Sequence, residues 1–199
     1  MTRYLHKLNP DADFVALDLE TTGGSTREDV VVEIGAIRYR CGYEVDRFDT
    51  LVKPSMPMLP WITRLTGITD DILSDAPAPG GVARRLIRFL RRTPLVAHNA
   101  SFDVPLLERF LTRHGRRSAL ANPWQAPPVL CTLRLARRLL PALPTRRLEA
   151  LAGHLGYEPR SIERSGRSGA RFHRAAQDAE AAAHIFFRLS ERLEGRLER

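Results

Sequence analysis

The chain has 199 residues, of which 43% are hydrophobic and 27% charged, the composition of an ordinary soluble globular protein with one core. The two cysteines give no disulfide framework, the N-terminus is polar and no apolar run approaches the length of a membrane span, so we expect a cytoplasmic protein with no signal peptide and no membrane partner. The net charge of +8 favours a polyanionic partner over a surface that is charged only for solubility.

The first predicted element, residues 14–23, is a strand that ends in two acids and reads F-V-A-L-D-L-E-T-T-G. Because successive side chains of a strand point to opposite faces, one face carries Val15, Leu17 and Leu19 and the other carries Phe14, Ala16, Asp18 and Glu20. A strand that is apolar on both faces belongs in the middle of a sheet covered on both sides. Two carboxylates that leave its end in the same direction either lie in solvent or hold a cation, and this stretch alone leaves both interpretations open.

The remaining elements are predicted from periodicity and turn residues, in chain order. Strands at Val30–Tyr39 and Glu44–Val52 pair as a hairpin across Cys41 and Gly42, and they precede helices at Trp61–Leu65 and Val82–Arg91 and a buried strand at Leu95–Ala97. A helix between Ser101 as N-cap and Gly115 as stop is followed by an edge strand at Val129–Cys131 and by helices at Thr132–Leu140, Arg147–Leu155 and Ala175–Leu193. Residues 54–60, 118–128 and 158–171 are predicted loops, the last of them basic and mobile.

The order of these elements predicts the fold class. Three adjacent strands followed by alternating helices and strands favour an α/β fold, a mixed sheet with helices on both faces and the first strand at its centre. The sequence contains no internal repeat and no domain boundary. We therefore expect a single domain over residues 1–199, with its core at about residues 13–193.

Two of the predicted helices carry an acid in the first turn, on the face that meets the core. Residues three and four apart share one face of a helix. By this spacing Asp103 lies with Leu106, Leu107 and Phe110, and Asp178 lies with Ala182, Ile185 and Leu189. Together with Asp18 and Glu20, they make four carboxylates that stand at the ends of elements and face the interior.

Four converging buried carboxylates indicate a metal site, because without a cation they would raise one another's pKa values. Mg²⁺ prefers a few carboxylates together with water and phosphate oxygens, and oxygen ligands without a Cys/His cluster argue against zinc. Two such ions about 3.5–4 Å apart can clamp the attacking and leaving oxygens of a phosphodiester. His173, five residues before Asp178, is suited to act as a general base at such a site.

Four short segments of the chain carry distinctive strings. They are residues 18–23 (D-L-E-T-T-G), 65–69 (L-T-G-I-T), 98–103 (H-N-A-S-F-D) and 173–179 (H-R-A-A-Q-D-A). The first, third and fourth resemble the three motifs of the DEDD-type 3′–5′ exonucleases, in the subgroup with a histidine before the last aspartate, and the second resembles the segment between the first two motifs. That family includes the proofreading subunit of bacterial DNA polymerase III. The resemblance covers about residues 13–189, and the three motifs in order make it specific.

The resemblance implies an RNase H-like fold with a five-stranded mixed sheet and two bound ions, Mg²⁺ or Mn²⁺. The implied metal ligands are Asp18, Glu20, Asp103 and Asp178, and His173 is the implied base. The residues implied to contact the terminal nucleotide are Thr21, Thr22, Asn99 and Phe102. Phe102 is equally well explained as a core residue, whereas Leu65 and Trp61, which could wedge the last base, are better explained as core packing.

The resemblance thus predicts a metal-dependent exonuclease that removes nucleoside 5′-monophosphates from the 3′ end of single-stranded nucleic acid, with DNA favoured over RNA. The alternatives are an RNA-trimming, oligoribonuclease-like enzyme on the same fold and a catalytically idle binding module. No residue obviously reads a 2′-hydroxyl. The arginines of residues 160–174 are either phosphate ligands or a solvated surface. Only 21 residues follow Asp178, which favours a stand-alone enzyme, although a DNA polymerase stays a candidate partner.

Overall fold

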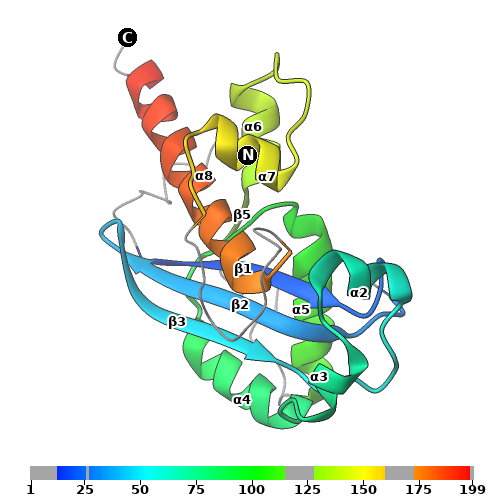
Figure 1. The fold of residues 1–199 in the computed structure, drawn as a ribbon. Helices are drawn as coiled ribbons and strands as arrows, with labels where there is room; N and C mark the ends of the chain where they lie inside the picture. The colour runs from blue at the N-terminus through cyan, green and yellow to red at the C-terminus, as the bar shows by residue number, and fades with distance from the viewer. Residues whose placement is uncertain (1–12, 26, 115–127, 160–172, 198–199) are drawn as a thin grey trace.

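The structure is a computed structural model that describes residues 13–25, 27–114, 128–159 and 173–197, and its centre is a five-stranded mixed sheet (Figure 1). The strands are β1 (Phe14–Thr21), β2 (Val31–Arg40), β3 (Tyr43–Leu51), β4 (Leu95–Ala97) and β5 (Val129–Cys131). Their order across the sheet is β3-β2-β1-β4-β5. The pairs β1–β2 and β2–β3 are antiparallel, and β1–β4 and β4–β5 are parallel. The predicted strands, the central place of the first one and the edge place of the last are all confirmed.

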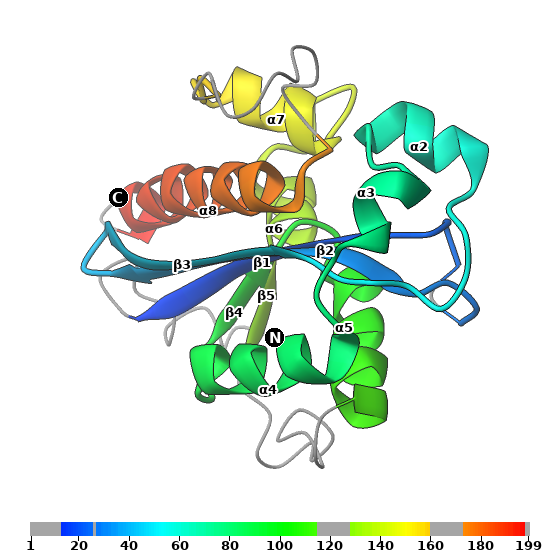
Figure 2. The ribbon, with the colours of Figure 1, turned by 60° about the horizontal axis from the view of Figure 1, so that its bottom comes forward.

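Seven described helices cover the two faces of this sheet. They are α2 (Pro60–Thr66), α3 (Asp70–Ser74), α4 (Pro79–Leu90), α5 (Ala100–His114), α6 (Thr132–Leu139), α7 (Leu148–His154) and α8 (Ala175–Leu197). Figure 2 shows α6, α7 and α8 on one side of the sheet and α4 and α5 on the other. The structure therefore confirms the predicted α/β fold with helices on both faces. Within the described part of the chain, no helix has the length and apolar character that a membrane span requires.

The alternation of side chains along β1 divides the core into two layers. Phe14 and Ala16 pack with Phe186 of α8, in the layer that also contains side chains of α6 and α7. Val15 and Leu17 face the opposite way and pack with side chains of α4 and α5. Burial on both faces follows from the apolar alternation read in the sequence. Asp18 and Glu20 continue the first layer, beneath the start of α8.

The helix boundaries differ from the predicted ones where short-range capping decides them. Helix α4 begins at Pro79, a residue favoured in the first turn because its φ angle is preset, so the two glycines at 80 and 81 lie inside the helix rather than before it. Helix α3 was not predicted, because it has only five residues and depends on the side chain of Thr69, which accepts the N–H of Ile72. Helix α8 continues to Leu197, beyond the predicted end.

Helix α5 begins at Ala100, so Ser101 lies within its first turn and the prediction of Ser101 as N-cap was wrong. The Ser101 hydroxyl instead donates to Asn99 Oδ1 over 2.9 Å. Three predictions fall outside the described residues: Gly115 as the helix stop, most of the loop at 118–128, and nearly all of the basic loop at 158–171.

Candidate active site

The sheet brings two pairs of residues together beneath α8. In the antiparallel register of β1 and β2, Asp18 lies opposite Gly35 and Glu20 lies opposite Glu33. These positions continue the face on which Phe14 packs against α8. Both predicted acids of β1 therefore point toward the first turn of α8.

Gly35 allows the start of α8 to approach the sheet closely. A Cβ atom at this position would lie 2.1 Å from the carbonyl carbon of Ala175 and 2.2 Å from the nitrogen of Ala176. No side chain fits there, so glycine is required for this crossing. Because Gly35 is the sheet partner of Asp18, the crossing places the first turn of α8, with Asp178, directly over the acids of β1.

The fourth acid comes from α5, which packs on the face of the sheet opposite α8. Asp103 is 3% exposed, and its carboxylate accepts backbone hydrogen bonds from Leu19 and from its own residue. Leu19 stands between Asp18 and Glu20, so this contact brings Asp103 to the end of β1 where the other acids meet. The first turn of α5 thus positions its acid as the sequence predicted.

The four carboxylates affect one another's ionisation. Burial raises the pKa of Asp18 well above its ordinary value, and the charges of Asp103, Asp178 and Glu20 raise it further. Burial, followed by the charges of Asp178 and Glu33, raises the pKa of Glu20 to about 8. Burial is also the main reason that the pKa of Asp103 and that of Asp178 rise to about 7. A set of acids that resists ionisation without a partner suits a divalent cation.

Two geometric observations test whether these residues fit a metal. Ligand atoms of Glu20, His173 and Asp178 all lie within 4.8 Å of one another, close enough to share one ion. Oδ1 of Asp178 is buried and has no hydrogen-bond partner in the described part of the chain, although a buried carboxylate oxygen is costly to leave unpaired. The donor set therefore fits a cation.

His173 lies two residues before the start of α8, in an uncommon backbone conformation. Its φ angle is +66°, in the left-handed region that non-glycine residues rarely adopt. Its N–H donates to Asp178 Oδ2 over 3.3 Å, and this bond helps to hold the conformation. Such strained residues concentrate at functional sites. His173 thus lies together with Glu20 and Asp178, and its role as base stays a prediction.

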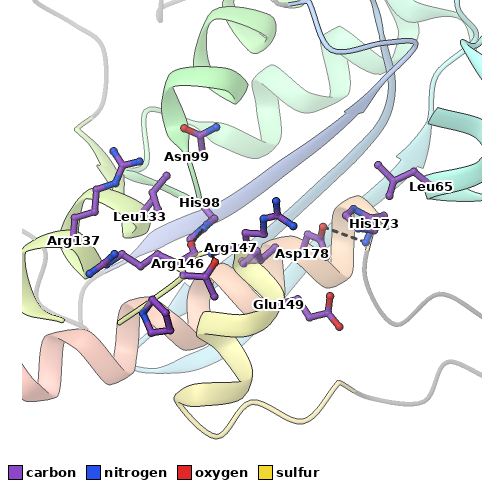
Figure 3. A pocket seen from close by; sticks show the side chains of 13 residues that line it. Leu65, His98, Asn99, Leu133, Arg137, Arg146, Arg147, Glu149, His173 and Asp178 are labelled. Atoms are coloured by element: carbon purple, nitrogen blue, oxygen red, sulfur yellow. Dashed lines mark hydrogen bonds between the residues drawn. The ribbon is translucent and has the colours of Figure 1, made fainter. Parts of the chain in front are cut away.

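A cleft of about 720 Å³ opens beside these residues and changes character along its length (Figure 3). One end contains His173 and Asp178, with Leu65 of α2 above them and Glu149 of α7 below. The other end contains Arg137 of α6, and Arg146 and Arg147 precede α7 along its wall. The sequence did not predict a role for these arginines, because it does not show that α6 and the segment before α7 pack beside the acids.

His98, which begins the second motif, has a structural role. Its Nδ1 is hydrogen-bonded to Thr132 Oγ1 and its Nε2 to the carbonyl oxygen of Arg146, each over 2.9 Å. Burial lowers the pKa of His98 to about 4, so the ring is neutral at physiological pH. It joins the end of β4 to the segment that carries the cleft arginines, and both ring nitrogens are occupied.

The predicted contacts to the terminal nucleotide have different surroundings. Asn99 and Leu65 line the cleft, and Leu65 is 41% exposed and Trp61 47% exposed, so the expectation that both pack in the core was wrong. Phe102 is partly buried against the core layer of α4 and α5. Thr21 and Thr22 are buried, and their hydroxyls donate to the Gly23 carbonyl and to Asp29 respectively.

Thr22 has no free polar group. Its hydroxyl also accepts the N–H of Val30, its own N–H donates to the Val30 carbonyl, and its carbonyl accepts the N–H of Leu59, the N-cap residue of α2. Thr22 therefore ties the end of β1 to the start of α2. A contact between Thr22 and substrate stays a prediction, and the structure gives this residue a structural role that explains it equally well.

Comparison with known proteins places the chain among nucleases. The sequence model of the exonuclease family RNase_T matches residues 15–186. The chain is 37% identical over 180 residues to a PolC-type DNA polymerase III of Oceanobacillus iheyensis, an alignment that covers 90% of this chain but 12% of that protein. The chain thus spans about an eighth of the length of this curated relative.

Solved structures show the same architecture. Exonuclease X in complex with 5′ overhanging duplex DNA is 26% identical, with a TM-score of 0.64, and the match covers 90% of this chain and 92% of that one. E. coli Exonuclease I in complex with a dT13 oligonucleotide is 20% identical, with a TM-score of 0.76, over 94% of this chain and 42% of that one. These likenesses confirm the expected RNase H-like fold.

Proposed function

This chain belongs to the RNase_T exonuclease family, and we propose that it removes nucleoside 5′-monophosphates from the 3′ end of single-stranded DNA. The observation that carries the proposal is the buried carboxylate cluster at one end of an open cleft, in which Asp178 Oδ1 has no protein partner. A binding module without catalysis would not need acids that oppose one another's ionisation. We further propose that residues 1–199 form one exonuclease domain, with its core at about residues 13–193.

Two divalent cations, Mg²⁺ or Mn²⁺, are the proposed cofactors, held by Asp18, Glu20, Asp103 and Asp178. When bound, such ions polarise the phosphodiester and stabilise the charge that develops on the attacking and leaving oxygens. The protein's part is to hold four acids in place in a buried site. Glu20 and Asp178 come from elements far apart in sequence, and the close approach of α8 at Gly35 brings them together.

His173 is the proposed general base. Its ring nitrogen lies within 4.8 Å of carboxylate oxygens of Glu20 and Asp178, and His173 lines the open cleft. A ligand role for the imidazole is less suitable, because hard cations such as Mg²⁺ prefer oxygen. In the proposed role, His173 takes the proton of the water that attacks the terminal phosphodiester.

The cleft is the proposed path of the single strand. Arg137 and Arg147 are exposed, and neither pairs with an acid in the described part of the chain, so their guanidinium groups are available to phosphate oxygens. The apolar side chain of Leu65, at the end of the cleft that contains His173, offers a contact for the terminal base. The net charge of +8 supports a polyanionic substrate.

The named relatives favour DNA over RNA and suggest a setting. The Exonuclease X structure contains duplex DNA with a 5′ overhang, and the Exonuclease I structure contains a dT13 strand. The relative from Oceanobacillus iheyensis is a DNA polymerase, which makes a polymerase the proposed protein partner. These are properties of those proteins, and they support the proposal for this chain.

The proposal is tested with 5′-labelled single strands of DNA and of RNA, each with Mg²⁺, Mn²⁺ or excess EDTA. We expect a ladder of products shortened from the 3′ end of DNA, no products in EDTA, and resistance of a strand that carries a 3′-phosphate. Faster degradation of RNA would favour the RNA-trimming alternative. Cutting of circular single strands would contradict an exonuclease.

A further inference from the structure

Glu33 is a buried acid of β2 whose two oxygens are both occupied by the start of α8. The side chain is 1% exposed. Oε1 accepts Nε and Nη2 of Arg174 over 2.9 and 2.5 Å, and Oε2 accepts the N–H of Ala175 over 3.0 Å. Ala175 is the first residue of α8, where N–H groups have no acceptor within the helix. Glu33 therefore both pairs with Arg174 and caps the helix.

The Glu33–Arg174 ion pair lies next to the proposed catalytic residues. Arg174 directly follows His173, and its carbonyl accepts the N–H of Asp178 over 3.0 Å. In the sheet, Glu33 lies opposite Glu20. The ion pair thus holds Arg174, which is adjacent to His173 in the chain and one helical turn before Asp178. It does so from β2, beside the strand that carries Glu20.

Glu33 differs from the proposed metal ligand Asp178 in the hydrogen-bond partners of its carboxylate oxygens. Both of its oxygens are held by protein donors, whereas Asp178 Oδ1 has no protein partner. Glu33 is therefore not available to a cation, although it lies beside Glu20. Gly35, two residues along the same face of β2, sets how closely α8 approaches the sheet, and Glu33 determines where along the strand the helix starts.

We propose that the Glu33–Arg174 ion pair is a positioning device, which anchors the first turn of α8 so that His173 and Asp178 stand correctly beside Glu20. This inference rests on the proposed exonuclease activity. Neither residue touches the reacting atoms; each acts through the groups that do. Misplacement of a catalytic group by about 1 Å can cost about 10²-fold in rate, so loss of the anchor should lower kcat.

The test compares Glu33→Ala, Glu33→Gln and Arg174→Gln with a matched control. Glu33→Ala removes both the cap and the ion pair, and we expect kcat to fall by about 10²-fold with KM changed by less than about threefold. Glu33→Gln keeps an acceptor for Ala175 and loses only the charge pair, so we expect a smaller loss of about tenfold. The control is Glu180→Gln, which breaks the ion pair between Arg47 of β3 and the second turn of α8.

A second measurement does not depend on activity. In the metal-free protein, amide hydrogen exchange of residues 173–178 should become faster in Glu33→Ala and in Arg174→Gln and stay unchanged in Glu180→Gln. Arg174 is 37% exposed, so Arg174→Gln serves if Glu33→Ala does not fold. The inference is overturned if kcat and exchange stay at wild-type values in the Glu33 and Arg174 variants, or if Glu180→Gln matches them. A wild-type chain that leaves DNA intact contradicts the proposed function, and amide exchange then still decides whether Glu33 anchors α8.

Discussion

The backbone N–H of His173 donates to Asp178 Oδ2 over 3.3 Å, while the other oxygen of the same carboxylate is buried without a partner in the described part of the chain. One side chain therefore holds the proposed base in place and offers an oxygen to a cation. The two roles can be separated experimentally, because Asn keeps an oxygen acceptor and loses the charge.

Asp178→Asn should lose on the order of 10³-fold or more in kcat, because a metal ligand supports several kcal/mol of transition-state stabilisation. The metal-free variant should be at least as thermally stable as the wild type, since burial and neighbouring charges oppose the ionised form of Asp178. The control Glu191→Gln alters an exposed acid of the same helix, paired with Arg188, and should keep wild-type activity. Retention of activity in Asp178→Asn would show that this carboxylate does not bind the essential metal.

The raised pKa values of the cluster make a prediction about stability and pH. For an acid whose pKa is higher in the folded state, stability is fully present below the unfolded value and is lost as the pH rises through the folded value. The ordinary values are 3.8 for Asp and 4.5 for Glu, and the folded values are about 7 for Asp103 and Asp178 and about 8 for Glu20. The metal-free protein should therefore lose stability progressively as the pH rises from the ordinary pKa values to the folded ones.

Melting temperatures measured without metal at about pH 5 and about pH 8.5 check this, and the melting temperature should be lower at the higher pH. Mg²⁺ should restore it at the higher pH and have little effect at the lower one, where protons occupy the carboxylates. The loss should be smaller in Asp178→Asn, which has one acid fewer. Equal melting temperatures at both pH values would mean that neither burial nor neighbouring charge raises the pKa values of these acids.

The fold and the acids were predictable because both depend on local pattern. Apolar alternation along β1 defines its two buried faces, and helical spacing places Asp103 and Asp178 toward the core. The role of Gly35 was not predictable, because a glycine inside a strand does not show which backbone will cross it. The assignments of individual residues to metal or substrate stay predictions.

Contacts that join distant elements account for the remaining differences. Leu65 and Trp61 read as core residues by their apolar character, but α2 lies at the rim of the cleft and leaves both exposed. Thr22 matched a motif position, yet its hydroxyl is used by Asp29 and Val30. The sequence alone does not show which groups a buried hydroxyl will bond, or which apolar side chains will lie at the rim of a cleft.

Thr22→Val should destabilise the fold without changing substrate affinity. It leaves the carboxylate of buried Asp29 and the N–H of Val30 each without one hydrogen bond, a loss that typically costs about 1–3 kcal/mol. Urea denaturation measures the loss, and KM for a single strand should stay within about twofold because the hydroxyl faces the protein interior. A raised KM at unchanged stability would instead support the predicted contact with the terminal nucleotide.

Replacing Arg137 and Arg147 together by Ala should weaken binding of single-stranded DNA in a salt-dependent way. Each phosphate contact on a single strand contributes about 0.7 to the slope of log K against log salt, so the slope should decrease by about 1.4. KM should rise more than kcat falls, because Arg137 lies at the end of the cleft away from Asp178 and Arg147 lies along the cleft wall, where both are proposed to contact phosphates. Arg40→Ala, on an exposed arginine paired with Asp13, is the control. An unchanged salt slope would place the strand elsewhere.

His173→Ala tests the proposed base. General-base catalysis typically contributes about 10²–10⁴-fold, so kcat should fall by that order while KM changes little. Mg²⁺ should still bind, as measured by its effect on melting temperature, because four carboxylates remain. In Mg²⁺-saturated enzyme the acid limb of the pH–rate profile should flatten, since a general base must be deprotonated to accept the proton. A histidine that only maintained the turn before α8 would lower stability when replaced and leave the shape of the profile unchanged.

His173→Asn separates these cases further, because Asn tolerates the left-handed backbone that His173 adopts and cannot accept a proton. It should keep the wild-type melting temperature and lose activity as His173→Ala does, and wild-type kcat in His173→Asn would remove this residue from the mechanism.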